Sequence, residues 1–369
     1  MPPLALGELV VTAYVVLGGR GYIGTPLVQR LQVEGRRPIL VADVAFGNGA
    51  AGDPAPFDPA TFATATRPQG LRLDVTDPSA TMDAFAAVRA AWPGRLVVLH
   101  LAGLFTKRPE ERASTPDEEY RRQNLGGVRT VVDALNAIDG PSLLVFQSAG
   151  GLERFPDETP SDPYLRSKLE AEQLVKGECG VDWVILRPMR VLGTPGELLS
   201  PRRLKGPLLD GLRTARDAGR VPTDVLTSLV LDAEVVDGTR SILLPAANSQ
   251  VAYVHLKDAV TALCWAASPR TPSRRTFRVT TFPAVTFTDI GRVLVEELRW
   301  MGVEATTVEH VSDTPILLSP PLSAEFPWAP SLRTSKDVVR AATWQYLEVA
   351  REEGRRLQAE AAIAAGERT

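Results

Sequence analysis

The chain has 369 residues, of which 44% are hydrophobic and 23% charged. These proportions are those of a globular protein, so they exclude disorder, collagen and coiled coil for most of the length. Lys+Arg 41 against Asp+Glu 44 gives a formal net charge of −3, and no dense run of Lys and Arg occurs. A nucleic-acid partner is therefore not expected, because binding phosphates needs a concentrated basic face.

Cysteine and histidine are scarce. Two cysteines, Cys179 and Cys264, and three histidines argue against a disulfide framework and against a metal site. The first residues lack the basic segment and long apolar core of a secretory signal. The longest apolar runs are strand-length, short of the ~20 residues that cross a bilayer. We therefore expect a cytoplasmic protein with no membrane partner.

The first half of the chain alternates short apolar runs with longer amphipathic ones, which is typical of a parallel sheet covered by helices. The predicted strands are 13–17, 38–42, 71–74, 96–101, 142–147 and 183–186. The predicted helices between them are 25–34, 80–91, 118–137 and 163–176. This alternation predicts an α/β, Rossmann-like doubly wound parallel sheet. Residues 45–70, rich in Gly, Pro and Ala, predict an insertion or a flexible flap.

The second half has a looser pattern, which predicts a smaller C-terminal substrate-binding domain. Its predicted elements are short helices within 198–231, a strand at 251–256, helices at 258–267 and 289–300, a strand at 276–280, and a long charged helix from 336 to the end, solvated over 348–369. We expect a dinucleotide-binding domain over 1–187, completed by about 251–268. Residues 188–250 and 269–369 would form the smaller region.

A glycine-rich turn joins the first predicted strand to the first predicted helix and reads Gly-Gly-Arg-Gly-Tyr-Ile-Gly over residues 18–24. Glycine permits a tight turn and a close approach of the backbone to a pyrophosphate, and the helix N-terminus offers free N–H groups. The turn therefore predicts a dinucleotide site. Its expected cofactor contacts are Gly18, Gly21, Tyr22, Ile23 and Gly24.

Asp43 ends the second predicted strand, 19 residues after Gly24. A carboxylate there can accept hydrogen bonds from the adenosine ribose hydroxyls and would repel a 2′-phosphate, which favours NAD over NADP. Two alternatives stay open. In the first, Asp43 is a turn or helix-cap residue. In the second, Arg20 or Arg67 binds a 2′-phosphate.

Asp74-Val75 follows the third predicted strand. An Asp there can hydrogen-bond the adenine amino group while Val75 packs on the ring. A helix-capping role before Pro78 explains the same Asp equally well.

Tyr164 and Lys168 are four residues apart on a predicted helix, so both lie on one face. An ammonium beside a phenol favours the phenolate and lowers the phenol pKa from about 10, which allows proton exchange with an alcohol or carbonyl. Ser148 ends a predicted strand shortly before this pair, where its hydroxyl can reach the same substrate oxygen. A surface Tyr–Lys pair and a strand-end Ser are the alternative.

These segments together resemble the extended branch of the short-chain dehydrogenase/reductase superfamily, the NAD-dependent epimerase/dehydratase family, over about residues 12–265. The resemblance implies that Ser148, Tyr164 and Lys168 are catalytic and that Asn124, in Asn124-Leu125-Gly126-Gly127, supports Lys168. It also implies further cofactor contacts, which are Leu101, Ala102, Gly103, Lys168 and Pro188. The segment 253–260 is similar to the family's return from the substrate domain, in which His255 is expected to be packed and satisfied.

The implied activity is an NAD(H)-dependent oxidoreductase that moves a hydride between nicotinamide and a secondary alcohol or ketone of a small molecule. The alternative is a sugar-nucleotide epimerase with tightly bound cofactor, and a catalytically silent cofactor sensor is a third hypothesis. Dehydratase chemistry is disfavoured because Ala149-Gly150, not an Asp-Glu pair, follows Ser148. The leucine-rich segment 198–231 suggests an apolar lid, whereas Arg202, Arg203 and Lys205 could hold a diphosphate or carboxylate.

A homodimer is also expected. In this family the helices that correspond to 118–137 and 163–176 often meet their copies across a two-fold axis.

Overall fold

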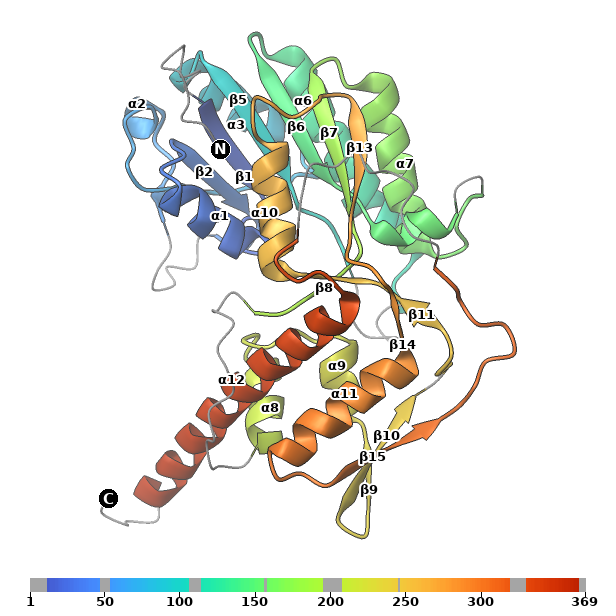
Figure 1. Cartoon of the computed structure of the whole chain (residues 1–369). Coiled ribbons are helices and arrows are strands. Elements are labelled where there is room, and N and C mark those ends of the chain that lie inside the picture. Colours follow the sequence, from blue (N-terminus) through green and yellow to red (C-terminus); the bar gives the residue numbers. More distant parts are fainter. Residues whose placement is uncertain are drawn as a thin grey trace, which may run out of the picture. The chain divides into compact units, whose positions relative to one another are not determined.

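The computed structural model describes residues 12–46, 54–105, 114–155, 158–194, 208–244, 246–318 and 330–364. The chain divides into two compact units (Figure 1). The first comprises Met1–Pro188 and Val260–Arg278, and the second comprises Met189–Ala259 and Val279–Thr369. The expected division differs at the return segments, because 251–259 belong to the second unit and 269–278 to the first.

The first unit is built on an eight-stranded sheet in the order β13-β7-β6-β5-β1-β2-β4-β3. Its strands are β1 (Thr12–Leu17), β2 (Ile39–Asp43), β3 (Ala55–Pro56), β4 (Gln69–Arg72), β5 (Arg95–His100), β6 (Ser142–Gln147), β7 (Asp182–Pro188) and β13 (Arg275–Val279). The pairs from β7 to β3 are all parallel. The sheet confirms the predicted Rossmann-like fold, and the strand order reverses between β1 and β5.

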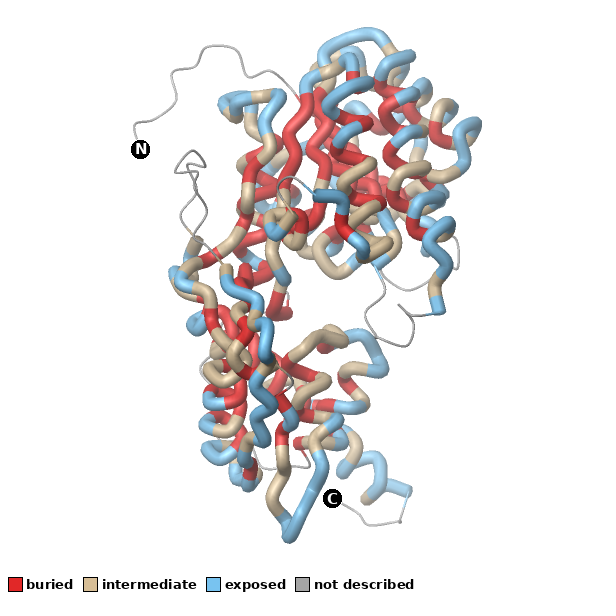
Figure 2. The backbone as a smooth tube through the Cα atoms, turned by 90° about the vertical axis from the view of Figure 1, so that its right-hand side faces the viewer, coloured by how far each residue is buried: buried red, intermediate tan, exposed pale blue. Residues whose placement is uncertain are grey.

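Helices cover both faces of this sheet. They are α1 (Gly24–Val33), α2 (Pro59–Phe62), α3 (Pro78–Ala91), α5 (Asp117–Tyr120), the π-helix η1 (Arg121–Gly126), α6 (Gly127–Ala137), the 3₁₀-helix η2 (Gly150–Arg154), α7 (Pro163–Glu178) and α10 (Leu256–Ala266). Side chains of α3, α6 and α7 form one core cluster with the sheet, while α1 and α10 lie over its other face (Figure 1). All six residues of β1 are buried, as in a strand covered on both faces. Figure 2 colours buried stretches of the backbone red and exposed ones pale blue.

The predicted helix 118–137 is interrupted in the structure. It consists of α5, η1 and α6, so one π-helical segment separates two α-helical ones. Such segments are rare and often lie at functional sites. Helix α7 begins where predicted because Asp162 caps it and Pro163 takes its first position, where no backbone N–H donor is needed.

The segment 45–70 was expected to be an insertion or flap, and its described part is instead integrated into the first unit. Strand β3 pairs in parallel with β4 and forms the edge of the sheet. Phe62 of α2 is fully buried and packs edge-to-face against Phe57. The apolar side chains of Phe57 and Phe62 pack this segment into the unit, which its Gly- and Pro-rich composition did not predict.

The second unit contains β8 (Arg190–Leu192), α8 (Leu208–Asp217), α9 (Val225–Leu231), β9 (Glu234–Val236), β10 (Thr239–Leu244), β11 (Gln250–Val251), β12 (Tyr253–His255), β14 (Val285–Thr286), α11 (Phe287–Trp300), β15 (Ala305–Glu309) and α12 (Ser335–Ala364). Its sheets are β15-β10-β9, β11-β14 and β12-β8. His255 is buried, and both ring nitrogens have partners, Gln345 and the Lys257 N–H. The expectation of a packed, satisfied histidine is confirmed.

The expectation that 348–369 forms a solvated helix is wrong for its first turns. Ala350 and Glu353 on α12 are fully buried, and the Glu353 carboxylate forms ion pairs with Arg220 and Arg356. Helix α12 packs along α8, which covers this face of an otherwise charged helix. From the sequence alone, a charged residue is expected to be exposed to solvent. A charged residue that is buried needs ionic partners, and these come from elsewhere in the chain.

Candidate active site

The glycine turn contacts the segment after β5. Gly18 has a φ of +78°, and a Cβ on it would lie 2.7 Å from the Ala102 backbone nitrogen. A Cβ on Gly24 would lie 2.2 Å from the Gly18 carbonyl oxygen. Side chains are therefore excluded at both positions, and the backbones of the two loops meet where the strand order reverses.

Asp43 lies where β2 ends and holds the glycine turn. Its Oδ2 accepts the Arg20 N–H at 3.0 Å and its Oδ1 accepts the Ala45 N–H at 3.0 Å. Each carboxylate oxygen has a further lone pair available for a hydroxyl donor. The Arg20 guanidinium lies 5.0 Å from the centre of the Phe46 ring, an attractive cation–π arrangement.

Asp74 and Val75 have local partners. Asp74 Oδ1 accepts the Thr76 N–H at 2.9 Å and the Thr76 hydroxyl at 2.8 Å, which forms a turn. The residue that caps α3 is Asp77, so the expected capping alternative for Asp74 is wrong by three residues. Val75 is buried, and a Cβ on Gly127 would lie 2.9 Å from its Cγ2, so this valine packs against α6.

Asn124 lies in η1 and is almost fully buried. Its Oδ1 accepts the Leu104 N–H at 2.7 Å, and its Nδ2 donates to the Leu104 carbonyl at 3.1 Å. The same Nδ2 donates to Ser167 Oγ at 2.9 Å, and Ser167 donates in turn to the Tyr164 carbonyl at 2.8 Å. Asn124 therefore ties the segment after β5 to the turn of α7 that carries Tyr164 and Lys168.

Lys168 is 6% exposed. Its Nζ donates to the Gln147 carbonyl at 3.2 Å and lies 5.1 Å from the centre of the Phe146 ring. A Cβ on Gly103 would lie 3.4 Å from this Nζ, so the segment after β5 passes directly beside it. Burial lowers the pKa of Lys168 to about 8, and the negative charge of Glu172 opposes that shift.

Tyr164 lies in the first turn of α7, one turn before Lys168, as the spacing predicts. Its ring is half-buried and packs edge-to-face against Phe105, with centroids 5.1 Å apart, and against Tyr120 at 6.3 Å. Aromatic neighbours on two sides restrict the direction of the ring. The phenol is thus held on a helix that Asn124 also anchors.

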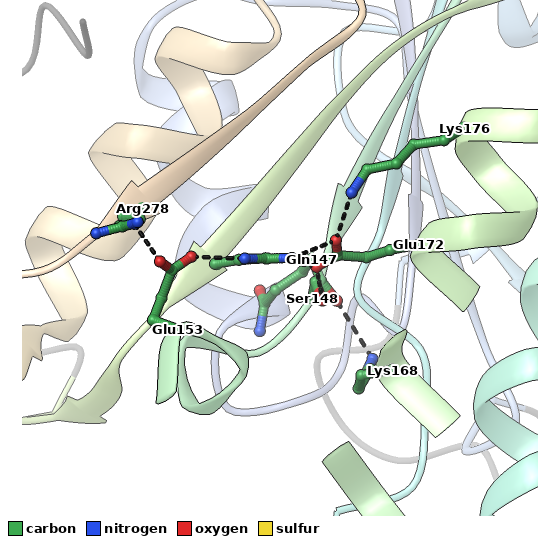
Figure 3. Close-up of polar contacts among 8 residues, drawn as sticks. Gln147, Ser148, Glu153, Lys168, Glu172, Lys176 and Arg278 are labelled. Carbon is green, nitrogen blue, oxygen red and sulfur yellow. Dashed lines mark hydrogen bonds and ion pairs between the residues drawn. The ribbon is translucent and has the colours of Figure 1, made fainter. Parts of the chain in front are cut away.

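Ser148 has a different partner from the one expected. Its side chain is buried, and its hydroxyl donates to Glu172 Oε1 at 2.6 Å (Figure 3). The single hydroxyl proton is therefore directed to a carboxylate inside the protein, which differs from the expected position beside a substrate oxygen. The next residue, Ala149, has no polar side chain.

Sequence reasoning missed the ionic network around Glu172. Arg187 donates Nε and Nη2 to the two Glu172 oxygens at 2.8 Å each and Nη1 to Glu153 at 2.7 Å. Arg278 also pairs with Glu153, and Lys176 donates to Glu172 at 2.9 Å (Figure 3). Burial alone would raise the pKa of Glu172. The donors, Arg187 foremost, have the larger combined effect, so the pKa of Glu172 is lowered. The continued spacing of four, from 164 to 168 to 172, was the available signal.

The predicted site residues gather because the carboxyl ends of parallel strands share one edge of the sheet. Leu17 of β1 is in register with His100 of β5, so the glycine turn and Leu101–Gly103 start side by side. Asp43 ends β2, Ser148 follows β6, and Pro188 ends β7. The structure thus brings these expected contacts to one edge, and the glycine positions of the turn, which leave no room for a side chain, together with the nearby carboxylate fit a dinucleotide.

Membrane spans and metal sites can be addressed in the same part of the chain. In the described ranges, no helix is long and apolar enough to cross a bilayer. No group of three or more His, Cys, Asp or Glu there could hold a metal ion.

The profile of the NAD dependent epimerase/dehydratase family matches residues 14–279. The chain belongs to this family. Membership confirms the resemblance seen in the sequence. It also confirms the expected type of enzyme, a short-chain dehydrogenase/reductase, and the expected cofactor class, NAD.

Curated relatives include the UDP-glucose 4-epimerase of Yersinia pestis, 30% identical over 173 residues, which are 44% of this chain and 47% of the relative. The Mus musculus UDP-glucose 4-epimerase is 28% identical over 196 residues, 48% of this chain and 53% of the relative. The chain spans about half the length of the curated relatives it matches.

Solved structures share the fold over most of this chain. The Thermotoga maritima UDP-glucose 4-epimerase with UDP-glucose has a TM-score of 0.61 at 16% identity and covers 94% of this chain and 99% of its own. The Thermus thermophilus UDP-glucose 4-epimerase complex with NAD has a TM-score of 0.60 at 20% identity, over 90% and 98%. At these identities the likeness shows the fold alone.

Proposed function

We propose that this protein transfers a hydride between NAD and a secondary alcohol or ketone of a small-molecule substrate, with Tyr164 as the proton donor and acceptor. The observation that carries the proposal is the pairing of Tyr164 and Lys168 on α7, with the Lys168 ammonium buried beside Gly103. Bound NAD would supply the hydride acceptor. The chain's own residues bind, orient and move the proton.

Each residue has a distinct part in this proposal. The glycine turn would take the pyrophosphate, and Asp43 the adenosine ribose. Asp74 and Val75 remain proposed adenine contacts, the former through the carboxylate oxygen that Thr76 does not use. Lys168 would bind the nicotinamide ribose and favour the phenolate of Tyr164, because a cation nearby stabilises an anion. Asn124 keeps the Leu104 backbone and α7 in place.

The substrate class and the net outcome separate two candidates. A net oxidoreductase releases changed cofactor, whereas an epimerase returns the hydride to the opposite face. The names of the curated relatives, UDP-glucose 4-epimerases, favour the second candidate and a sugar nucleotide. Arg202, Arg203 and Lys205, expected to hold a diphosphate, and the start of the expected apolar lid lie outside the described residues.

The test is absorbance in the reduced-nicotinamide band during turnover of candidate substrates, with product analysis by chromatography. A net change supports the oxidoreductase, and product without net change supports the epimerase. The proposal would be refuted if the protein neither bound NAD nor turned over any secondary alcohol, ketone or sugar nucleotide.

Asp43→Ala is expected to weaken NAD(H) binding by about 10-fold or more, because hydrogen bonds to a charged group are lost. NADP(H) binding should weaken less, since the repulsion of a 2′-phosphate is relieved as well. Calorimetric titration of the two cofactors checks this, with Asp43→Asn as the matched control that keeps an acceptor but removes the charge. A wild-type preference for NADP(H) would contradict the assignment and point to Arg20 or Arg67.

We also infer a homodimer through α5, η1, α6 and α7, and a cytoplasmic location, which the free buried Cys179 and Cys264 favour. The arginines of the first helical segment would repel their copies at a two-fold axis, but ion pairs within the chain balance their charge. These pairs are Arg121–Glu170 at 3.1 Å, Arg122–Glu119 at 2.8 Å and Arg129–Glu178 at 2.8 Å. Light scattering at micromolar concentration should therefore give twice the 39.9 kDa monomer mass, and a monomer reading would refute the dimer.

A further inference from the structure

A buried carboxylate lies on the same side of α7 as the proposed catalytic pair. Glu172 follows Tyr164 and Lys168 at intervals of four residues, so the three share one face of the helix. The Glu172 side chain is 0% exposed. A carboxylate without partners is strongly disfavoured in such a place, so loss of its partners would destabilise this region.

Four hydrogen bonds surround the two oxygens of Glu172. Oε1 accepts from Ser148 Oγ at 2.6 Å and from Arg187 Nε at 2.8 Å. Oε2 accepts from Arg187 Nη2 at 2.8 Å and from Lys176 Nζ at 2.9 Å. The donors come from the end of β6, from β7 and from α7 itself, so one side chain joins three elements (Figure 3).

Two hydrogen bonds in opposite directions join α7 to the end of β6. Lys168 donates from the helix to the Gln147 carbonyl, and Ser148 donates from the strand end to Glu172. Because Gln147 and Ser148 are adjacent, the second bond fixes the carbonyl that the first one uses. The Ser148 N–H also donates to the Leu186 carbonyl of β7 at 2.8 Å, so this strand end has little freedom.

We propose that Glu172 is a positioning residue for Lys168: through Ser148 and Arg187, its buried carboxylate holds the end of β6 against α7 and so sets where the Lys168 ammonium lies. The inference rests on the proposed function and deepens it. It assigns Ser148 to the support of Lys168 rather than to contact with the substrate. Glu153 extends the support, because Arg187 binds it as well and it belongs to η2.

The charges around Lys168 make the proposal measurable. Glu172 is the anion that favours its protonated form against burial. Arg187 on β7 and Lys176 on α7 donate to that anion. Glu153 on η2 accepts from Arg187 and pairs with Arg278 on β13. His100 on β5 stays neutral above acidic pH because burial lowers its pKa to about 3. Removing the Glu172 charge should therefore shift the deprotonation of Lys168 to lower pH.

The first experiment follows lysine ionisation in the full chain without turnover, by NMR of lysines labelled with ¹³C at Cε. The chain has six lysines, and the Lys168 signal is assigned by its loss in Lys168→Met. In Glu172→Gln the midpoint of the Lys168 titration should fall below that of the wild type. Glu178→Gln is the matched control, since Glu178 lies on the same helix, its side chain is 51% exposed, and its carboxylate pairs with the exposed Arg129.

The second experiment measures kcat, KM and thermal stability in Ser148→Ala. The positioning role predicts a lower Tm and a loss of kcat smaller than about 10-fold, with an unchanged Lys168 midpoint because the Glu172 charge remains. A serine that shares a proton with the substrate predicts a loss near ~100-fold at unchanged Tm. Ser148→Ala removes a single oxygen, so it keeps the test decisive where Glu172→Gln fails to fold.

The outcomes separate this proposal from the proposed function. A lowered Lys168 midpoint in Glu172→Gln but not in Glu178→Gln, with the milder Ser148→Ala effect, supports the positioning role. An unchanged or raised midpoint, or a kcat loss above about 10-fold at unchanged Tm in Ser148→Ala, overturns it. If the wild type neither binds NAD nor turns over, the proposed function fails, and the lysine titration still decides how Glu172 acts on Lys168.

Discussion

Replacement of Tyr164 by Phe is expected to lower turnover by at least ~100-fold, the scale of general acid–base catalysis, while NAD binding stays nearly unchanged. The substitution removes only the hydroxyl. The ring keeps its edge-to-face contacts with Phe105 and Tyr120, so α7 should remain in place. Steady-state kinetics, NAD titration and thermal unfolding of the same preparation check the three parts of this expectation.

Tyr14→Phe is the matched control, because it removes a phenolic hydroxyl from the amino-terminal half of β1 in the same unit. Its turnover should stay within about 2-fold of the wild type, well inside the ~100-fold expected of an acid–base group. Near-normal turnover of Tyr164→Phe with the true substrate would mean that the proton comes from another group, and the active-site assignment would fail.

Lys168→Met is expected to abolish most activity and, at the same time, to stabilise the fold. Turnover should fall at least ~100-fold and NAD binding should weaken, because in the proposed function one ammonium serves both proton transfer and the ribose. The free energy of unfolding at pH 7 should rise by on the order of 2 kcal/mol, since a buried cation is replaced by an apolar side chain of similar length. Sites that bind ligands often carry such a cost.

The stabilisation should depend on pH in a defined direction. The folded-state pKa of Lys168 is lowered to about 8 from 10.5. Between these values the unfolded chain holds the extra proton, so the wild type gains stability from this group as pH rises. The advantage of Lys168→Met is therefore full below pH 8 and lost by about pH 10.5.

Urea unfolding at pH 7 and pH 10 measures this difference, with the exposed Lys336→Met as the control that should show neither effect. A variant less stable than the wild type at pH 7 would show that the contacts of the ammonium with the Gln147 carbonyl and the Phe146 ring outweigh its burial.

Much of the candidate site follows from local sequence pattern. Glycines at 18, 21 and 24 follow an apolar run, and an Asp ends the next one, so both lie at the edge where parallel strands end. The spacing of Tyr164 and Lys168 places them on one helix face whatever the rest of the fold does. Short-range geometry is enough for these features, because a strand end or a helical turn is defined by its own residues.

The partners of charged and hydroxyl side chains were decided only by the tertiary structure. Ser148 donates to a carboxylate 24 residues later, and Arg187 meets Glu153, 34 residues earlier. Glu353 is buried because Arg220 reaches it across the second unit. The segment 45–70 has the composition of a flap, but its described part forms a strand and a short helix because Phe62 is buried. The physical reason is the same in each case. A local pattern states the type and spacing of side chains, whereas burial, and the partners that buried polar groups require, arise when segments distant in sequence pack together.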